Sequence, residues 1–128
     1  MLGARVAIGF GATSRATLAD VVALIERACG PIDAGTLLAT IERRAPLARD
    51  VAREFGCEVV TFDSTELARV AASNAQGETL VASPRALATV GTSSVAEASA
   101  LAALGRDARL VVARRTGRGC TCARAELT

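Results

Sequence analysis

The 128-residue chain contains no histidine, lysine, tryptophan or tyrosine, and only three phenylalanines. The absence of histidine removes the commonest general base and the commonest metal ligand. The absence of lysine excludes a Schiff base and the lysine of a phosphate-binding P-loop. The scarcity of aromatic rings leaves no stacking platform for single-stranded nucleic acid. Any proton transfer would therefore fall to carboxylates, cysteines, hydroxyls or water.

The sequence also lacks a long apolar run and a secretory leader pattern, because Met1 leads almost directly into a short strand. It has four cysteines. Cys120-x-Cys122 does not have the usual zinc spacing and has no second pair of ligands, whereas Cys29 and Cys57 are interpreted as buried filler. We expect a cytoplasmic protein with reduced thiols, no metal, no cofactor and no contact with a membrane.

The length fits one domain, over residues 1–128, with a core of alanine, valine, leucine and isoleucine. The net charge of +2 is nearly neutral and does not indicate nucleic-acid binding. Arginine is nevertheless concentrated in residues 105–128, where Asp107 and Glu126 are the acidic residues. This charge pattern suits an acidic ligand.

The hydrophobic pattern predicts an α/β domain with a mixed sheet of about five strands, helices on both faces and a C-terminal β-hairpin. Strands are predicted at residues 5–10, 37–41, 58–62, 109–113 and 120–125. Helices are predicted between them, where Thr17 with Asp20 caps the first and Pro46 opens the second. A short helix follows Asp63, residues 73–77 read as a loop, and another helix entry stands at residues 83–84.

A tight loop feeds directly into a helix over residues 91–101. Ser94 and Glu97 have the spacing of a capping box, and Gly105 stands where this helix should stop. The free N–H groups of a helix start suit an anion, and Thr92 and Ser93 add two hydroxyls to the loop. The alternative is an ordinary capped helix packed on the sheet.

Three further places are candidates for ligand contacts, each with an ordinary structural alternative. The glycine turn after the first strand is either a ligand loop or a generic turn, and it lacks the third glycine of a dinucleotide-binding fingerprint. The charged residues at the end of the second strand are either functional groups, which open α/β sheets often place there, or part of a solvated loop. The arginines of the hairpin either clamp carboxylates or lie in solvent. The residues concerned are Gly9, Gly11, Thr13, Ser14, Arg15, Thr40, Glu42, Arg44, Arg114 and Arg115.

The stretch from Gly91 to Leu101 closely resembles the signature G-x-x-SVAEAAAL of the CobE family, which also forms the C-terminal domain of CbiG. Other pieces resemble that family in the same order along the chain. They are Ile8 to Gly11, Leu38 to Arg44, Val60 to Leu67 and the hairpin from Arg114 to Ala123. The resemblance covers essentially the whole chain.

The resemblance implies a protein of cobalamin (corrin ring) biosynthesis. We expect it to bind a precorrin-type tetrapyrrole through the carboxylates of that ligand, at the candidate residues above together with Gly91, Thr92, Ser93 and Ser94. One alternative is a hydrolase or lyase acting on a precorrin lactone, with Glu42 as its acid or base. Another is a module that docks on a different enzyme of the corrin pathway.

Overall fold

The computed structural model describes residues 5–30, 32–33, 35–76, 95–105 and 107–127. The predicted loop at residues 91–94 and the predicted helix entry at residues 83–84 therefore lie outside the described residues. The elements are β1 (Val6–Ala12), α1 (Leu18–Ala28), β2 (Leu37–Ile41), the 3-10 turn η1 (Glu42–Arg44), α2 (Ala45–Phe55), β3 (Glu58–Phe62), α3 (Ser64–Gln76), α5 (Val95–Leu104), β4 (Ala108–Thr116) and β5 (Cys120–Leu127). None of the helices in these ranges is long and apolar enough to cross a membrane.

The strands form one mixed sheet in the order β3-β2-β1-β5-β4. β1, β2 and β3 are parallel, whereas β5 runs antiparallel to both β1 and β4. The predicted fold class, including the C-terminal hairpin, is confirmed. β1 and β4 are longer than predicted because both pair with β5 as far as its first residues, where Ala12 lies opposite Cys120 and Thr116 opposite Thr121.

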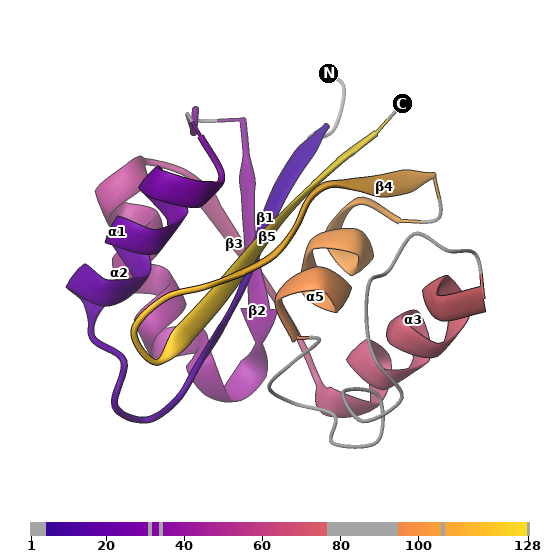
Figure 1. Ribbon diagram of the computed structural model, residues 1–128, viewed down its shortest axis with the longest axis horizontal. Coiled ribbons are helices and arrows are strands. Elements are labelled where there is room, and N and C mark those ends of the chain that lie inside the picture. Colours follow the sequence, from indigo (N-terminus) through magenta and orange to yellow (C-terminus); the bar gives the residue numbers. More distant parts are fainter. Residues whose placement is uncertain (1–4, 31, 34, 77–94, 106, 128) are drawn as a thin grey trace.

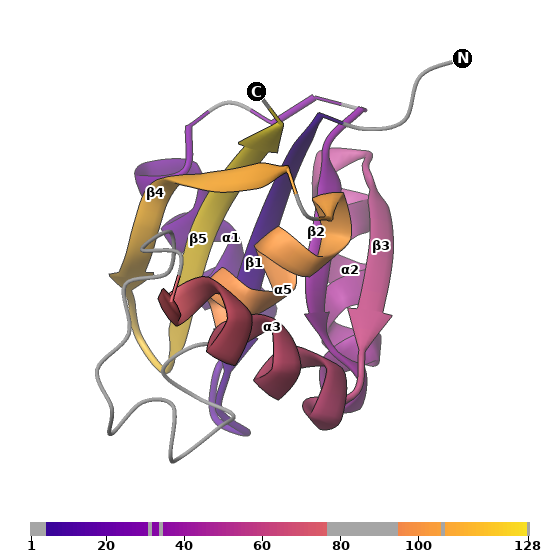
Figure 2. The ribbon, with the colours of Figure 1, turned by 90° about the vertical axis from the view of Figure 1, so that its right-hand side faces the viewer.

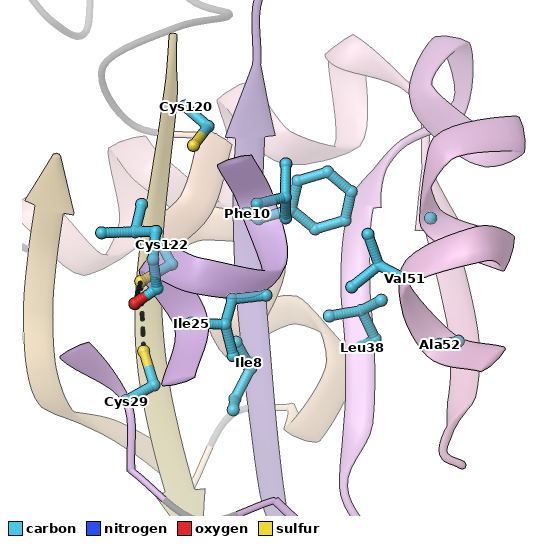
Figure 3. Close-up of a cluster of buried hydrophobic side chains, with 12 residues drawn as sticks. Ile8, Phe10, Ile25, Cys29, Leu38, Val51, Ala52, Cys120 and Cys122 are labelled. Atoms are coloured by element: carbon cyan, nitrogen blue, oxygen red, sulfur yellow. Dashed lines mark hydrogen bonds between the residues drawn. The ribbon is translucent and has the colours of Figure 1, made fainter. Parts of the chain in front are cut away.

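Helices cover both faces of the sheet, as Figure 1 shows. α1 and α2 pack together on one face, and α3 and α5 pack together on the other, where they lie in front of the sheet in Figure 2. Because side chains alternate along a strand, Ile8 and Phe10 point toward α1 and α2. Cys120 and Cys122 point to that same face, as predicted, and belong to the core shown in Figure 3.

Local hydrogen bonds fix the helix starts. The predicted capping box is formed at α1, where the Asp20 N–H donates to Thr17 Oγ1 and the Thr17 N–H donates to Asp20 Oδ2. A second box is formed by Asp63 and Glu66 at α3. The prediction of a loop at residues 73–77 is wrong for residues 73–76, which are helical. Residues 64–76 contain no glycine or proline, so nothing in the local sequence stops this helix before Gly77.

The backbone of β1 makes a very close approach to α5 at Gly9. A Cβ atom built on Gly9 would collide with Ala96 O and would lie 2.6 Å from Ser99 Oγ and 2.7 Å from Ala100 N. Alanine and serine residues along α5 allow this approach. All residues of α5 from Val95 to Leu101 are buried. Gly9 is therefore required by packing, because only a residue without a side chain leaves room for the helix.

Candidate ligand-binding site

Several loops meet at the carboxyl edge of the sheet, which is formed by the C-terminal ends of the parallel strands. The parallel strands β1, β2 and β3 all end there, and the β4–β5 turn joins them because Ala12 pairs with Cys120. α5 also begins at this edge (Figure 1). The chain leaves β1 toward the face covered by α1, whereas α5 lies on the opposite face. In open α/β sheets, ligands bind at the carboxyl ends of strands where successive connections go to opposite faces.

A hollow of about 230 Å³ lies at this point, between the end of β1 and the β4–β5 turn. We call it the hairpin hollow. Six of its eight lining residues are glycine or threonine, and the surface that they expose to the hollow is mostly apolar. The lining residues are Gly11, Ala12, Thr13, Thr116, Gly117, Gly119, Cys120 and Thr121.

Backbone hydrogen bonds hold the two walls of the hairpin hollow together. The Thr13 N–H donates to Gly119 O over 2.9 Å, and the Gly117 N–H donates to Cys120 O over 2.8 Å. Gly119 has a φ of +68°, a conformation that side-chain-bearing residues rarely adopt. The hollow is therefore built by the backbone of the turn, and its shape depends little on rotatable side chains.

Three arginines stand on the segments that border the hairpin hollow, although none of them is among its lining residues. The Arg44 Nε donates to Ala12 O over 2.8 Å, and the exposed Arg15 and Arg118 stand on the loop after β1 and at the β4–β5 turn. None of these three guanidinium groups forms an ion pair within the part of the chain that the structure describes. Guanidinium groups without an ion-pair partner are suited to bind carboxylates in a bidentate manner.

The structure therefore brings five of the sequence-predicted residues to this place, namely Gly11, Thr13, Ser14, Arg15 and Arg44. Gly117 and Gly119 of the turn line the hollow but were not among the residues predicted for the site, whereas Arg118 is one of the hairpin arginines considered there. The sequence signal that could have indicated this turn is the arginine between two glycines at the tip of the predicted hairpin.

Other predicted site residues lie elsewhere. Gly9 is packed under α5, and Thr40 is fully buried with its hydroxyl donating to Phe10 O over 2.7 Å. Arg115 lines a separate hollow of about 390 Å³, which it shares with Arg27 of α1. The predicted contacts of Gly91, Thr92, Ser93 and Ser94 lie outside the described residues. Ligand contacts at all of these positions stay predictions.

Glu42 is exposed in the first position of η1, directly after β2. It thus stands at the edge predicted for it, and its role as an acid or base is not decided by this position. Among the described residues, no group of three or more acidic, cysteine or histidine side chains is arranged to hold a metal ion.

Glu97 is a buried carboxylate that ties α5 to the edge strand β4. Its side chain is 0% exposed, and Oε2 accepts a hydrogen bond of 3.1 Å from the backbone N–H of Arg114. Arg114 lies where the pairing of β4 with β5 shifts register, so this N–H belongs to an irregular part of the edge. The other oxygen, Oε1, is buried and has no hydrogen-bond partner among the residues that the structure describes. Burial raises the pKa of the Glu97 carboxyl, and the Arg114 N–H and its guanidinium oppose this rise only in part.

Replacing Glu97 with glutamine is expected to change how stability depends on pH. The raised pKa means that the folded state binds the Glu97 proton more tightly than the unfolded state. Wild type should therefore lose stability, relative to Glu97→Gln, as pH rises from the ordinary glutamate value through the raised folded value. Urea unfolding of both proteins at a series of pH values measures this difference.

The alanine variant is the control for the hydrogen bond. Glutamine keeps an acceptor for the Arg114 N–H, whereas alanine leaves that N–H unpaired, so Glu97→Ala should be about 1–3 kcal/mol less stable than Glu97→Gln. Parallel pH profiles for wild type and Glu97→Gln would contradict the raised pKa.

Comparison with known proteins agrees with this architecture. A family model described as "Cobalamin synthesis G C-terminus" matches residues 6–125. The crystal structure of CobE, a protein from the cobalamin (vitamin B12) biosynthetic pathway, superposes with a TM-score of 0.74 at 30% identity, covering 96% of this chain and 93% of CobE. The structure of the cobalamin biosynthesis protein chiG from Agrobacterium tumefaciens str. C58 gives a TM-score of 0.71 at 26% identity, covering 96% of this chain and 98% of chiG.

No protein with a curated functional description matches the chain by sequence. The family match nevertheless spans nearly all of the chain, and the two solved structures share its fold from end to end. The chain therefore belongs to the family of the cobalamin synthesis G C-terminus and is a protein of cobalamin biosynthesis.

Proposed function

We propose that this protein binds a precorrin-type tetrapyrrole. The carboxyl edge of the protein's sheet would bind the acidic side chains of the macrocycle. The observation that carries the proposal is that Arg15, Arg44 and Arg118 stand on the segments bordering the hairpin hollow and form no ion pair with any described carboxylate. Membership in a cobalamin-synthesis family supplies the class of ligand.

The chemistry of the ligand fits the chemistry of the edge. A precorrin carries several acetate and propionate groups around a flat apolar ring. Arginine binds carboxylates through two parallel hydrogen bonds. A hollow of about 230 Å³ is too small for a whole macrocycle, so we propose that it receives one acidic side chain while the ring lies over the edge of the sheet.

Adding purified hydrogenobyrinic acid to the protein should give a saturable shift in the visible spectrum of the ligand. The apparent Kd should rise with sodium chloride concentration, because exposed arginine–carboxylate attraction is screened by salt. A spectrophotometric titration at low and high salt measures both effects. We propose that this binding takes place in the cytoplasm.

The same titration separates the alternatives. A bound spectrum that stays constant with time supports a binding protein, whereas steady conversion of a precorrin substrate would indicate the hydrolase or lyase. No shift with any pathway intermediate, together with co-purification of another corrin-pathway enzyme, would contradict the proposal and favour the docking module.

A further inference from the structure

Two cysteines far apart in the sequence lie in contact within the core. Cys29 ends α1 and Cys122 lies in β5, and their Sγ atoms are 3.3 Å apart (Figure 3). All four cysteines of the protein are free thiols, and Cys29 and Cys122 are 3% and 0% exposed. A disulfide needs an Sγ–Sγ distance of about 2.0 Å, so a small side-chain movement is enough to close the bond.

Positive charge surrounds Cys29. The Arg124 Nη1 donates to Cys29 O over 2.8 Å, and the Arg124 Nε is held by Glu126 Oε2 at 2.9 Å. Arg115 stands opposite Cys122 in the pairing of β4 with β5. The hydrogen bond with Cys122 lowers the pKa of the Cys29 thiol, and Arg124 and Arg115 lower it further, against the opposing effect of burial. The same hydrogen bond and burial raise the pKa of Cys122. We therefore take Cys29, whose backbone carbonyl accepts from Arg124, as the nucleophile of the pair.

A second hollow lies near this pair, although neither cysteine lines it. The second hollow, of about 390 Å³, is lined by Leu24, Arg27, Ala28, Arg115 and Thr116. Ala28 directly precedes Cys29, and Leu24 O lies 4.0 Å from Cys122 Sγ. Because both thiols are almost fully buried, a small uncharged oxidant reaches them more readily than a bulky disulfide does.

We propose that Cys29 and Cys122 form a peroxide-sensitive dithiol that closes reversibly to a disulfide and fixes the end of α1 to β5. The Cys29 thiolate attacks one oxygen of the peroxide, the O–O bond breaks, and the departing hydroxide is protonated to water. Cys122 then attacks the sulfur of the resulting Cys29 sulfenic acid, the S–O bond breaks, and a second water leaves. Two thiols are oxidised, one peroxide is reduced, and an external dithiol reverses the change.

Closure of this bond should stabilise the fold. It joins residues 93 positions apart, and cross-links across long loops restrict the unfolded chain most. We expect the Tm of the oxidised protein to rise by about 10 °C.

The test treats the reduced protein with an equimolar amount of hydrogen peroxide. Wild type should lose two of its four thiols and gain a link between tryptic peptides 28–43 and 119–124. Fragmentation should place the link on Cys122 rather than Cys120. Dithiothreitol should restore both thiols and return the Tm to that of the reduced protein.

Three variants complete the test. Cys57→Ser is the matched control, because Cys57 is half-buried before β3, and it should behave as wild type does. Cys29→Ser and Cys122→Ser should form no internal link and show no rise in Tm. The proposal is overturned if peroxide leaves Cys29 and Cys122 reduced, takes them only to sulfinic acids, or links Cys57 between molecules instead. It does not depend on tetrapyrrole binding.

Discussion

Gly9→Ala is expected to destabilise the protein by at least about 3 kcal/mol, a large part of the roughly 5–15 kcal/mol that stabilises an ordinary domain. The added methyl group would overlap Ala96 O and would lie 2.7 Å from Ala100 N, and both are backbone atoms of α5. A backbone atom cannot turn aside as a flexible side chain can. The helix would have to move off β1, which would open the core on that face of the sheet.

Gly35→Ala is the matched control. Gly35 is exposed, its new Cβ would lie 3.4 Å from Asp33 Oδ1, and no strained φ is involved. Its free energy of unfolding should change by no more than about 0.5 kcal/mol. Thermal and urea unfolding of both variants measures the difference. If Gly9→Ala were as stable as Gly35→Ala, the close approach of α5 to β1 would be wrong.

The double variant Arg15→Ala/Arg118→Ala should bind hydrogenobyrinic acid about 100-fold more weakly than wild type. Each lost arginine–carboxylate contact is worth about 1.5 kcal/mol or more, and each 1.4 kcal/mol is a factor of ten in Kd. Both side chains are exposed, so their removal should leave the Tm nearly unchanged. The Kd of the variant should also depend less on salt.

Arg49→Ala/Arg53→Ala is the charge-matched control, because it removes two exposed arginines from α2. Its Kd should stay within about twofold of wild type, because neither arginine is among the residues that line the hairpin hollow. Equal losses of affinity in the two double variants would mean that general positive charge attracts the ligand. Such a result would contradict a site at the hairpin hollow.

Local patterns in the sequence predicted the elements well. β2 and β3 have the predicted bounds, and Thr17 with Asp20 forms the predicted cap, because each depends on neighbouring residues alone. The predicted ends of β1 and β4 were too short because their last residues pair with β5, which is far along the chain. The bounds of a strand that pairs with a distant segment cannot be predicted from the residues of that strand alone.

The candidate site could be predicted only in part, because it too depends on contacts between residues that are far apart in the sequence. Gly9 and Gly11 read alike in the sequence, yet Gly9 is packed under α5 and Gly11 lines the hairpin hollow. The carboxylate of Glu97, predicted from its spacing to Ser94 as part of a cap, reaches β4 and accepts the Arg114 N–H. Arg118 reaches the edge only because the β4–β5 turn folds back beside β1. In each case the deciding partner lies too far along the chain for spacing to indicate it.

The most direct test locates the bound ligand by nuclear magnetic resonance. Titrating ¹⁵N-labelled protein with hydrogenobyrinic acid should shift the amide signals of Gly11, Thr13, Gly117 and Gly119 most strongly. Amides of α2 on the covered face, such as Val51 and Ala52, should not move. Saturable binding with its largest shifts away from the β1 and β4–β5 loops would contradict the proposed site.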